Sequence, residues 1–245
     1  MANQSWIYEP TSRWIRASYD GKIVANSKKS MLMIESSVEL DYYFPKEDIR
    51  LDLLEVSDHV EISDRGKRIY WNLKLGETII EKAAWTYEKH ENRPDFRGYI
   101  AITWHKMDHW HEEEEEVFDE PRNPYYRVDT IKSSRHIEVF IEGIKIADTR
   151  SPNIVFETHL PTRYYIPKED VQLEHLIPNN TKTVCPYKGF ASYYDVKINK
   201  NKYENIVWTY LNPIPEAPKL KNMLAFWPEK DKRLQIFVDG ELKNT

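Results

Sequence analysis

The sequence predicts a mainly all-β protein made of two tandem copies of a small antiparallel β unit. Each copy is expected to be a barrel, a sandwich or a tent-like arrangement of sheets, and a pseudo-twofold axis is expected to relate the copies. Three observations predict this. The stretch "YYFPKEDI" recurs as "YYIPKEDV", apolar and polar residues alternate on either side of short turns, and the 245 residues include 16 Tyr and 8 Trp. Wide aromatic side chains suit pleated sheets.

The repeat extends far beyond those eight residues. A shift of 122 positions aligns Gly21 with Gly143, and it needs no gap from Arg13 to Leu54. One extra residue then enters the second copy, and a shift of 123 aligns Trp85 with Trp208. The polar stretch "DEPRN" (119–123) reads as a linker. We therefore expect residues 1–118 to form a first β repeat with an N-terminal extension and an acidic connector, and residues 124–245 to form the second.

Each copy contains segments with the pattern of strands. "WIRASYDGKIVANS" alternates around Asp20-Gly21, and "HIEVFIEGIKIAD" alternates around Glu142-Gly143; both are hairpin signals. "IYWNLKLGETIIEKAAWTY" gives two further strands around Gly76, and "LQIFVDGEL" reads as one more hairpin. The proline of each "PKED" motif fixes a turn that a short helical turn can follow. Adjacent tyrosines in a regular strand point to opposite faces, so at least one of each Tyr-Tyr pair should pack inward.

The composition argues against several classes of protein. A net charge of −5 without an arginine-rich face argues against nucleic-acid binding. No apolar run approaches a membrane span, and the N-terminus does not resemble a signal peptide, so we expect no membrane contact. The single cysteine allows no internal disulfide, which favours a reducing, cytoplasmic location. No phosphate-binding glycine loop or other cofactor motif is present, so the cofactor stays unknown. We expect a monomer with pseudo-dimeric halves.

Cys185, in "TVCPYKGF", is a candidate nucleophile because a neighbouring cation lowers the pKa of a thiol. Lys188 is three residues away, and Gly189 permits a tight turn. The alternative is a buried thiol that acts as a small apolar side chain. At the matching positions the first copy has Ile62, which favours the buried thiol, and Arg65, which retains the cation. A basic side chain on a glycine turn can contact an anion.

Glu35 and Glu157 each end an apolar run, where an unpaired carboxylate is costly. Arg13 and Arg135 occur in both copies and are possible partners. If Glu157 instead faces a pocket, its pKa would rise and it could act as a general base. Pairing is the favoured hypothesis.

The stretch "WHKMDHWHEEEEEVF" has features of a metal site. His105 and His109 would share one face of a helix, and His111 follows them. However, the HExxH pattern is absent, and a run of glutamates usually forms a solvated face. The sequence therefore predicts no specific metal site.

Several motifs together carry a resemblance to a known family. "FETHLPTRYYIPKEDV", "TVCPYKGFASYYDV", "VWTYLNPIPEA", "MDHWHEEEEEVFDEPRNPYYRVD" and "SSRHIEVFIEGIKIADTRSP" resemble the family catalogued as domain of unknown function 427, in its form with two copies per chain. The resemblance implies a mostly antiparallel β domain of about a hundred residues per copy, and it implies that the glutamate run connects the copies. A nucleotidyltransferase label sometimes attached to the family lacks support here, because the Gly-Ser turn and paired aspartates of such enzymes are missing. The family pattern falls on Glu157, Arg163, Tyr164, Tyr165, Pro167, Asp170, Cys185, Pro186, Lys188, Gly189, Tyr193, Trp208 and Tyr210.

Two hypotheses of function follow. In the first, the second repeat binds a small polar or anionic metabolite in an aromatic-lined pocket, which could carry an enzymatic activity. Its catalytic candidates are Cys185, Lys188 and Glu157. Its ligand-binding candidates are Arg163, Tyr164, Tyr165, Tyr193, Trp208 and Tyr210. In the second hypothesis, the protein is a non-catalytic scaffold or interaction module without a small-molecule site, and the same residues maintain the fold.

Overall fold

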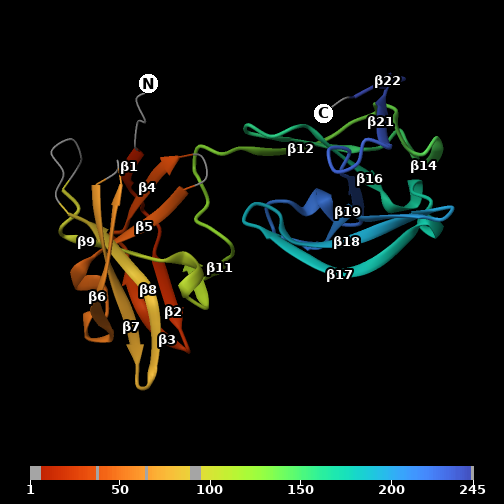
Figure 1. Ribbon diagram of the computed structural model, residues 1–245. Coiled ribbons are helices and arrows are strands. Elements are labelled where there is room, and N and C mark those ends of the chain that lie inside the picture. The colour runs from red at the N-terminus through yellow and green to blue at the C-terminus, as the bar shows by residue number, and fades with distance from the viewer. Residues whose placement is uncertain (1–6, 37–38, 64–65, 89–94, 244–245) are drawn as a thin grey trace. The chain divides into compact units, whose positions relative to one another are not determined.

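The computed structural model describes residues 7–36, 39–63, 66–88 and 95–243. The chain divides into two compact units, Met1–Asn123 and Pro124–Thr245, coloured red to green and green to blue in Figure 1. Regular structure in the described residues consists of β-strands and three-residue 3-10 turns. The prediction of an all-β fold is therefore confirmed. None of the described helical turns is long and apolar enough to cross a membrane.

The first unit contains two antiparallel sheets. The seven-stranded sheet has the order β1 (Ile7–Pro10), β4 (Met31–Ser36), β5 (Glu39–Pro45), β9 (Tyr99–Ile102), β8 (Thr78–Tyr87), β7 (Gly66–Leu75) and β6 (Leu54–Ser63). The four-stranded sheet has the order β11 (Glu115–Val117), β10 (His109–Glu112), β2 (Ile15–Tyr19) and β3 (Lys22–Ser27). The 3-10 turns are η1 (Lys46–Asp48), η2 (Leu51–Leu53) and η3 (Trp104–Lys106).

The second unit repeats this arrangement. Its seven-stranded sheet has the order β12 (Val128–Lys132), β15 (Asn153–Glu157), β16 (Arg163–Pro167), β20 (Met223–Phe226), β19 (Asn201–Pro213), β18 (Gly189–Ile198) and β17 (Leu176–Cys185). Its four-stranded sheet has the order β14 (Ile144–Thr149), β13 (Ile137–Ile141), β21 (Leu234–Val238) and β22 (Glu241–Leu242). Its 3-10 turns are η4 (Lys168–Asp170), η5 (Leu173–His175) and η6 (Pro218–Leu220). Each unit thus has a pair of sheets and not a closed barrel, and the predicted duplication is confirmed.

The hairpin turns follow the glycine signals in the sequence. Asp20 and Gly21 have φ angles of 47° and 67°, and Glu142 and Gly143 have φ angles of 52° and 76°. Two successive positive φ angles define the turn that suits the twist of a two-residue hairpin. These turns join β2 to β3 and β13 to β14.

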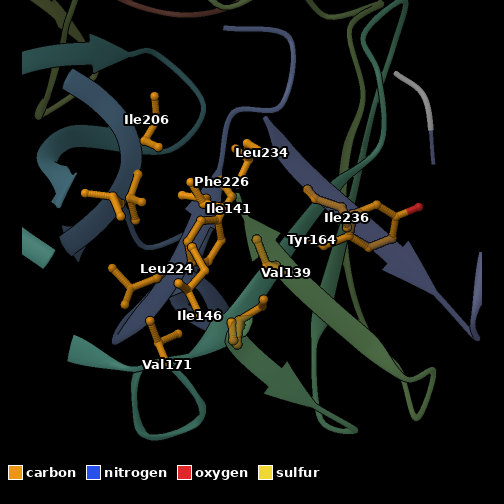
Figure 2. Close-up of a cluster of buried hydrophobic side chains, with 14 of the residues drawn as sticks. Val139, Ile141, Ile146, Tyr164, Val171, Ile206, Leu224, Phe226, Leu234 and Ile236 are labelled. Carbon is orange, nitrogen blue, oxygen red and sulfur yellow. The ribbon is translucent and has the colours of Figure 1, made fainter. Parts of the chain in front are cut away.

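The main core of the second unit joins its two sheets. Alternation along β13 buries Ile137, Val139 and Ile141 completely, as the sequence predicts. They pack against side chains of the seven-stranded sheet, among them Leu224 and Phe226 (Figure 2). Because burial of each such side chain contributes roughly 1.5–3 kcal/mol, this cluster holds the sheets together.

The paired tyrosines serve two separate clusters. Tyr164 belongs to the core between the sheets, whereas Tyr165 belongs to a smaller cluster on the opposite face of the seven-stranded sheet. Tyr42 and Tyr43 divide in the same way in the first unit. The prediction that neighbouring tyrosines point to opposite faces is confirmed, and both members of each pair are buried.

The repeated "PKED" motif links the two sheets of each unit. The Asp48 carboxylate, at the end of η1, accepts a hydrogen bond of 2.6 Å from the hydroxyl of Ser27 on β3. The Asp170 carboxylate accepts one of 2.5 Å from Thr149 on β14. Next to the motif, Ile49 and Val171 form bridges to β3 and β14. The motif recurs because the same connection between sheets is built twice.

The acidic run is part of the first unit and does not connect the copies. Strands β10 and β11 form a hairpin on the edge of the four-stranded sheet, so the connector reading is wrong. Glu112 is buried, and its carboxylate accepts hydrogen bonds from Tyr42 (2.6 Å) and Arg13 (2.5 Å).

His109 lies in a strand, where it cannot share a helix face with His105. Hydrophobic residues on both sides of the run, Trp110 in β10 and Val117 in β11, are buried and anchor the two strands of the hairpin.

Candidate functional site

Most of the predicted site residues gather on one face of the second unit. This face belongs to the seven-stranded sheet and lies opposite the core between the sheets; we call it the outer face. Strand pairing places a residue of β18 and one of β19, Tyr193 and Trp208, directly opposite each other on it. The face carries Glu157, Arg163, Tyr165, Cys185, Tyr193, Trp208 and Tyr210, with Lys188 in the turn that follows β17.

Tyr164 does not join the other predicted ligand-binding residues. Its ring packs in the core between the sheets, and Figure 2 shows its hydroxyl pointing away from that cluster. Because side chains alternate along a strand, Tyr164 and Tyr165 cannot both reach one site. The predicted convergence is therefore wrong for Tyr164.

A buried ion pair lies at the edge of the outer face. The Lys188 Nζ atom is 2.5 Å from the Glu157 Oε1 atom, and the two side chains are only 9% and 5% exposed. The Tyr126 hydroxyl is 3.4 Å from the second carboxylate oxygen, and its ring stacks on Tyr187 at 4.8 Å. Tyr126 lies just before β12, which is the edge strand opposite β17 in this sheet. The stacking of Tyr187 on Tyr126 therefore brings the β17–β18 turn close to that opposite edge. Arg135, one of the partners considered for Glu157, pairs with Asp239 instead.

Gly189 makes this position of Lys188 possible. Its φ angle is +98°, a conformation that side chains other than glycine rarely adopt. A Cβ atom at this position would lie 3.3 Å from the side chain of Ile214, whose backbone N–H donates to the Lys188 carbonyl oxygen. The backbone therefore turns sharply after Lys188, and only glycine fits there without strain.

Cys185 is half-buried beside this ion pair and packs with the cluster of the outer face. Burial raises the pKa of its thiol above the ordinary value, and the nearby Lys188 ammonium lowers it by less. The structure therefore favours the packing role over the nucleophile, because the reactive thiolate is the disfavoured form.

This environment predicts a protected thiol. At pH 8 iodoacetamide should alkylate Cys185 more slowly in the native protein than in urea, since burial shields the thiol and its raised pKa keeps it protonated to a higher pH than in the unfolded chain. Mass spectrometry of timed samples measures the two rates, and the single cysteine makes assignment unambiguous. Equal rates with and without urea would restore the nucleophile hypothesis.

Aromatic side chains form the centre of the outer face. The Trp208 Nε1–H group donates to the Tyr165 hydroxyl at 3.0 Å, and Tyr193 shares a hydrogen bond of 3.0 Å with Thr183. Burial raises the pKa of Tyr165 and of Tyr210, so both phenols stay protonated. Trp208 and Tyr193 are only half-buried. The face therefore offers an accessible aromatic surface with hydroxyl groups beside it.

Strand pairing corrects the alignment of the two copies at Cys185. Cys185 pairs with Gly189 across its hairpin, as Ser63 pairs with Gly66. Ser63, and not Ile62, is thus the counterpart of Cys185, because the extra residue of the second copy lies in the turn 186–188. Arg65 and the side chain of Glu35 lie outside the described residues, so the predictions about them stay untested.

The main difference between the copies was not predicted. In the first unit, the Arg68 guanidinium lies 3.9 Å above the ring of Trp85. Ala191 occupies the equivalent position, because Arg68 pairs with Tyr87 as Ala191 pairs with Tyr210. The signal was visible, since the aligned stretches begin "RIYW" and "ASYY".

Among the residues that the structure describes, one cluster of side chains has donor atoms close enough to hold a metal ion. His136, Glu138 and Asp148 bring three donor atoms within 4.8 Å of one another. However, the Lys145 ammonium contacts Glu138 at 2.6 Å and Asp148 at 2.7 Å, so these carboxylates already share a cation. His109, from the predicted histidine group, contacts Glu116 at 2.5 Å.

Comparison with known proteins agrees with the duplicated architecture. The search of curated proteins returned no similar protein. A family model described as "Domain of unknown function (DUF427)" matches residues 7–113 and, separately, residues 129–242. Together the two segments span nearly the whole chain, and each covers most of one unit. The chain therefore belongs to this family, as a member with two copies of the domain in tandem.

Proposed function

We propose that the second unit binds a small polar molecule on its outer face, over Trp208 and Tyr193. The observation that carries the proposal is that the second unit has Ala191 at the position where the first unit has Arg68. In the first unit Trp85 and Tyr70 are 4% and 8% exposed, with Arg68 beside both of them. Their counterparts Trp208 and Tyr193 are half-buried and partly accessible.

The polar groups around this surface suit orientation of a ligand. Aromatic walls with a few fixed polar groups are typical of small-molecule sites. The Tyr193 hydroxyl and the Lys188–Glu157 pair supply hydrogen-bonding groups, and Tyr165 holds the Trp208 ring in place. Lys188 is already neutralised by Glu157, so the geometry favours a polar ligand over a simple anion. Cys185 has a packing role in this proposal.

Ligand-observed NMR of the purified chain with a panel of amino acids, amines, sugars, nucleosides and carboxylates tests the proposal. We expect saturation transfer to at least one compound, and we expect Trp208→Leu to weaken its binding by about tenfold or more, the usual effect of removing a central aromatic contact. Trp85→Leu, at the matched position of the first unit, should leave binding unchanged. Tyr193→Leu provides a second variant of the same surface.

Two results would contradict the proposed binding site. Binding that survives both Trp208→Leu and Tyr193→Leu would place the ligand elsewhere. If no compound binds and native mass spectrometry finds no co-purifying small molecule, the proposal fails and the scaffold hypothesis is favoured.

A further inference from the structure

We infer that the ligand of the outer face is an organic cation of the guanidinium or alkylammonium class. This inference rests on the proposed function and specifies its ligand. The reason is that the first unit already contains such a cation on the equivalent surface, as the side chain of Arg68.

The first unit shows how the surface holds a guanidinium. Arg68 lies 3.9 Å from the ring centroid of Trp85 and 5.1 Å from that of Tyr87. It donates hydrogen bonds to the hydroxyls of Tyr87 (2.8 Å) and Tyr70 (3.3 Å). A cation over aromatic faces, with hydroxyl acceptors at its edge, is the usual composition of an aromatic cation site.

The second unit keeps the aromatic part of this site and lacks the cation. Trp208, Tyr210 and Tyr193 occupy the positions of Trp85, Tyr87 and Tyr70 in the same strand register. Ala191 ends at its Cβ atom where Arg68 extends over the rings. Among the residues that the structure describes, no cationic side chain lies over Trp208 or Tyr210. The Tyr210 hydroxyl, the counterpart of the best acceptor for Arg68, makes no hydrogen bond within the described part of the chain. Tyr210 itself is 5% exposed, so the half-buried Trp208 and Tyr193 are the accessible part of this surface.

Two cationic side chains of the outer face, Lys188 and Arg163, are each paired with a carboxylate. The Lys188 ammonium is held against Glu157 at 2.5 Å, which leaves the pair without net charge. Arg163 is likewise paired, at 2.6 Å from Glu229. In the first unit Glu61 lies 3.9 Å from Arg68, and strand pairing places Thr183 at its position in the second unit. The site therefore lacks the cation and its adjacent carboxylate together, and recognition would depend on the aromatic rings and hydroxyls.

Titration of the full chain with N-acetyl-arginine amide tests this inference, with the uncharged isostere N-acetyl-citrulline amide as the matched ligand. We expect one site, with an affinity for the arginine derivative at least about tenfold higher, because the cation–ring attraction is lost in the isostere. Ala191→Arg should abolish binding, since the new side chain would occupy the rings as Arg68 does. Arg68→Ala should create a second site and double the stoichiometry.

The possible outcomes distinguish a failure of the cation inference from a failure of the proposed function. Equal binding of the two derivatives, or arginine binding that survives both Ala191→Arg and Trp208→Leu, would overturn the cation inference. If neither derivative binds but a neutral compound of the panel binds and is lost in Trp208→Leu, the proposed function stands and the inference fails. If nothing binds to the wild type, both fail. Should Ala191→Arg not fold, the half-buried position of Trp208 makes Trp208→Leu the deciding variant.

Discussion

Replacing Lys188 with Met is expected to lower the free energy of unfolding by about 3 kcal/mol, because it leaves the Glu157 carboxylate buried without its partner. The Glu157 side chain is 5% exposed, and its other hydrogen-bond partner among the described residues is the Tyr126 hydroxyl at 3.4 Å. One neutral hydrogen bond does not replace an ion pair in such surroundings. Urea denaturation, followed by fluorescence and circular dichroism, measures the change.

Two further variants separate burial from charge. Lys145→Met removes a lysine that has two carboxylate partners, but these side chains are 19% to 46% exposed, and we expect a much smaller loss than for Lys188→Met. The double variant Lys188→Met/Glu157→Leu should recover most of the loss, since no unpaired charge stays buried. A Lys188→Met variant no less stable than Lys145→Met would show that Glu157 finds water or another partner.

Replacing Glu112 with Ala is expected to lower the free energy of unfolding by about 2–3 kcal/mol, because it removes hydrogen bonds to a charged acceptor from Tyr42 and Arg13. Tyr42 is 2% exposed, and its hydroxyl would lose its acceptor. Burial and the nearby Glu112 carboxylate raise the pKa of Tyr42, so the hydroxyl stays a hydrogen-bond donor at neutral pH. Urea denaturation again gives the magnitude.

The same run of glutamates supplies the control. Glu114 is two residues away, its side chain is 80% exposed, and its contact with Arg16 is long at 3.3 Å. Glu114→Ala should change the free energy of unfolding by less than about 0.5 kcal/mol. Similar effects of the two substitutions would mean that the whole run is a solvated face, as its composition alone indicates.

Much of the architecture could be predicted from the amino-acid sequence. The two "PKED" motifs, the Asp-Gly turn and the alternation of Ile137, Val139 and Ile141 are local patterns with local causes: a fixed proline φ, a positive φ and a two-residue period. The pocket hypothesis also grouped Glu157, Cys185 and Lys188, and the structure brings these three side chains together. The favoured partner of Glu157, Arg135, was wrong because Arg135 pairs with Asp239.

Other features depend on which strands become neighbours. Composition does not distinguish Glu112 from Glu114, but the pairing of β10 with β2 turns only one of them toward Tyr42. Counting residues aligned Ile62 with Cys185, and only the ladder of hydrogen bonds locates the extra residue in the β17–β18 turn.

The sequence by itself determined a duplicated β unit, its hairpins and most residues of one face. The tertiary structure decided the partner of Glu157, the separation of Tyr164 from Tyr165 into different clusters, and the exposure of Trp208 beside Ala191. The physical reason is that turns and side-chain alternation arise from neighbouring residues, whereas ion pairs and covered surfaces arise where a folded sheet brings distant strands together.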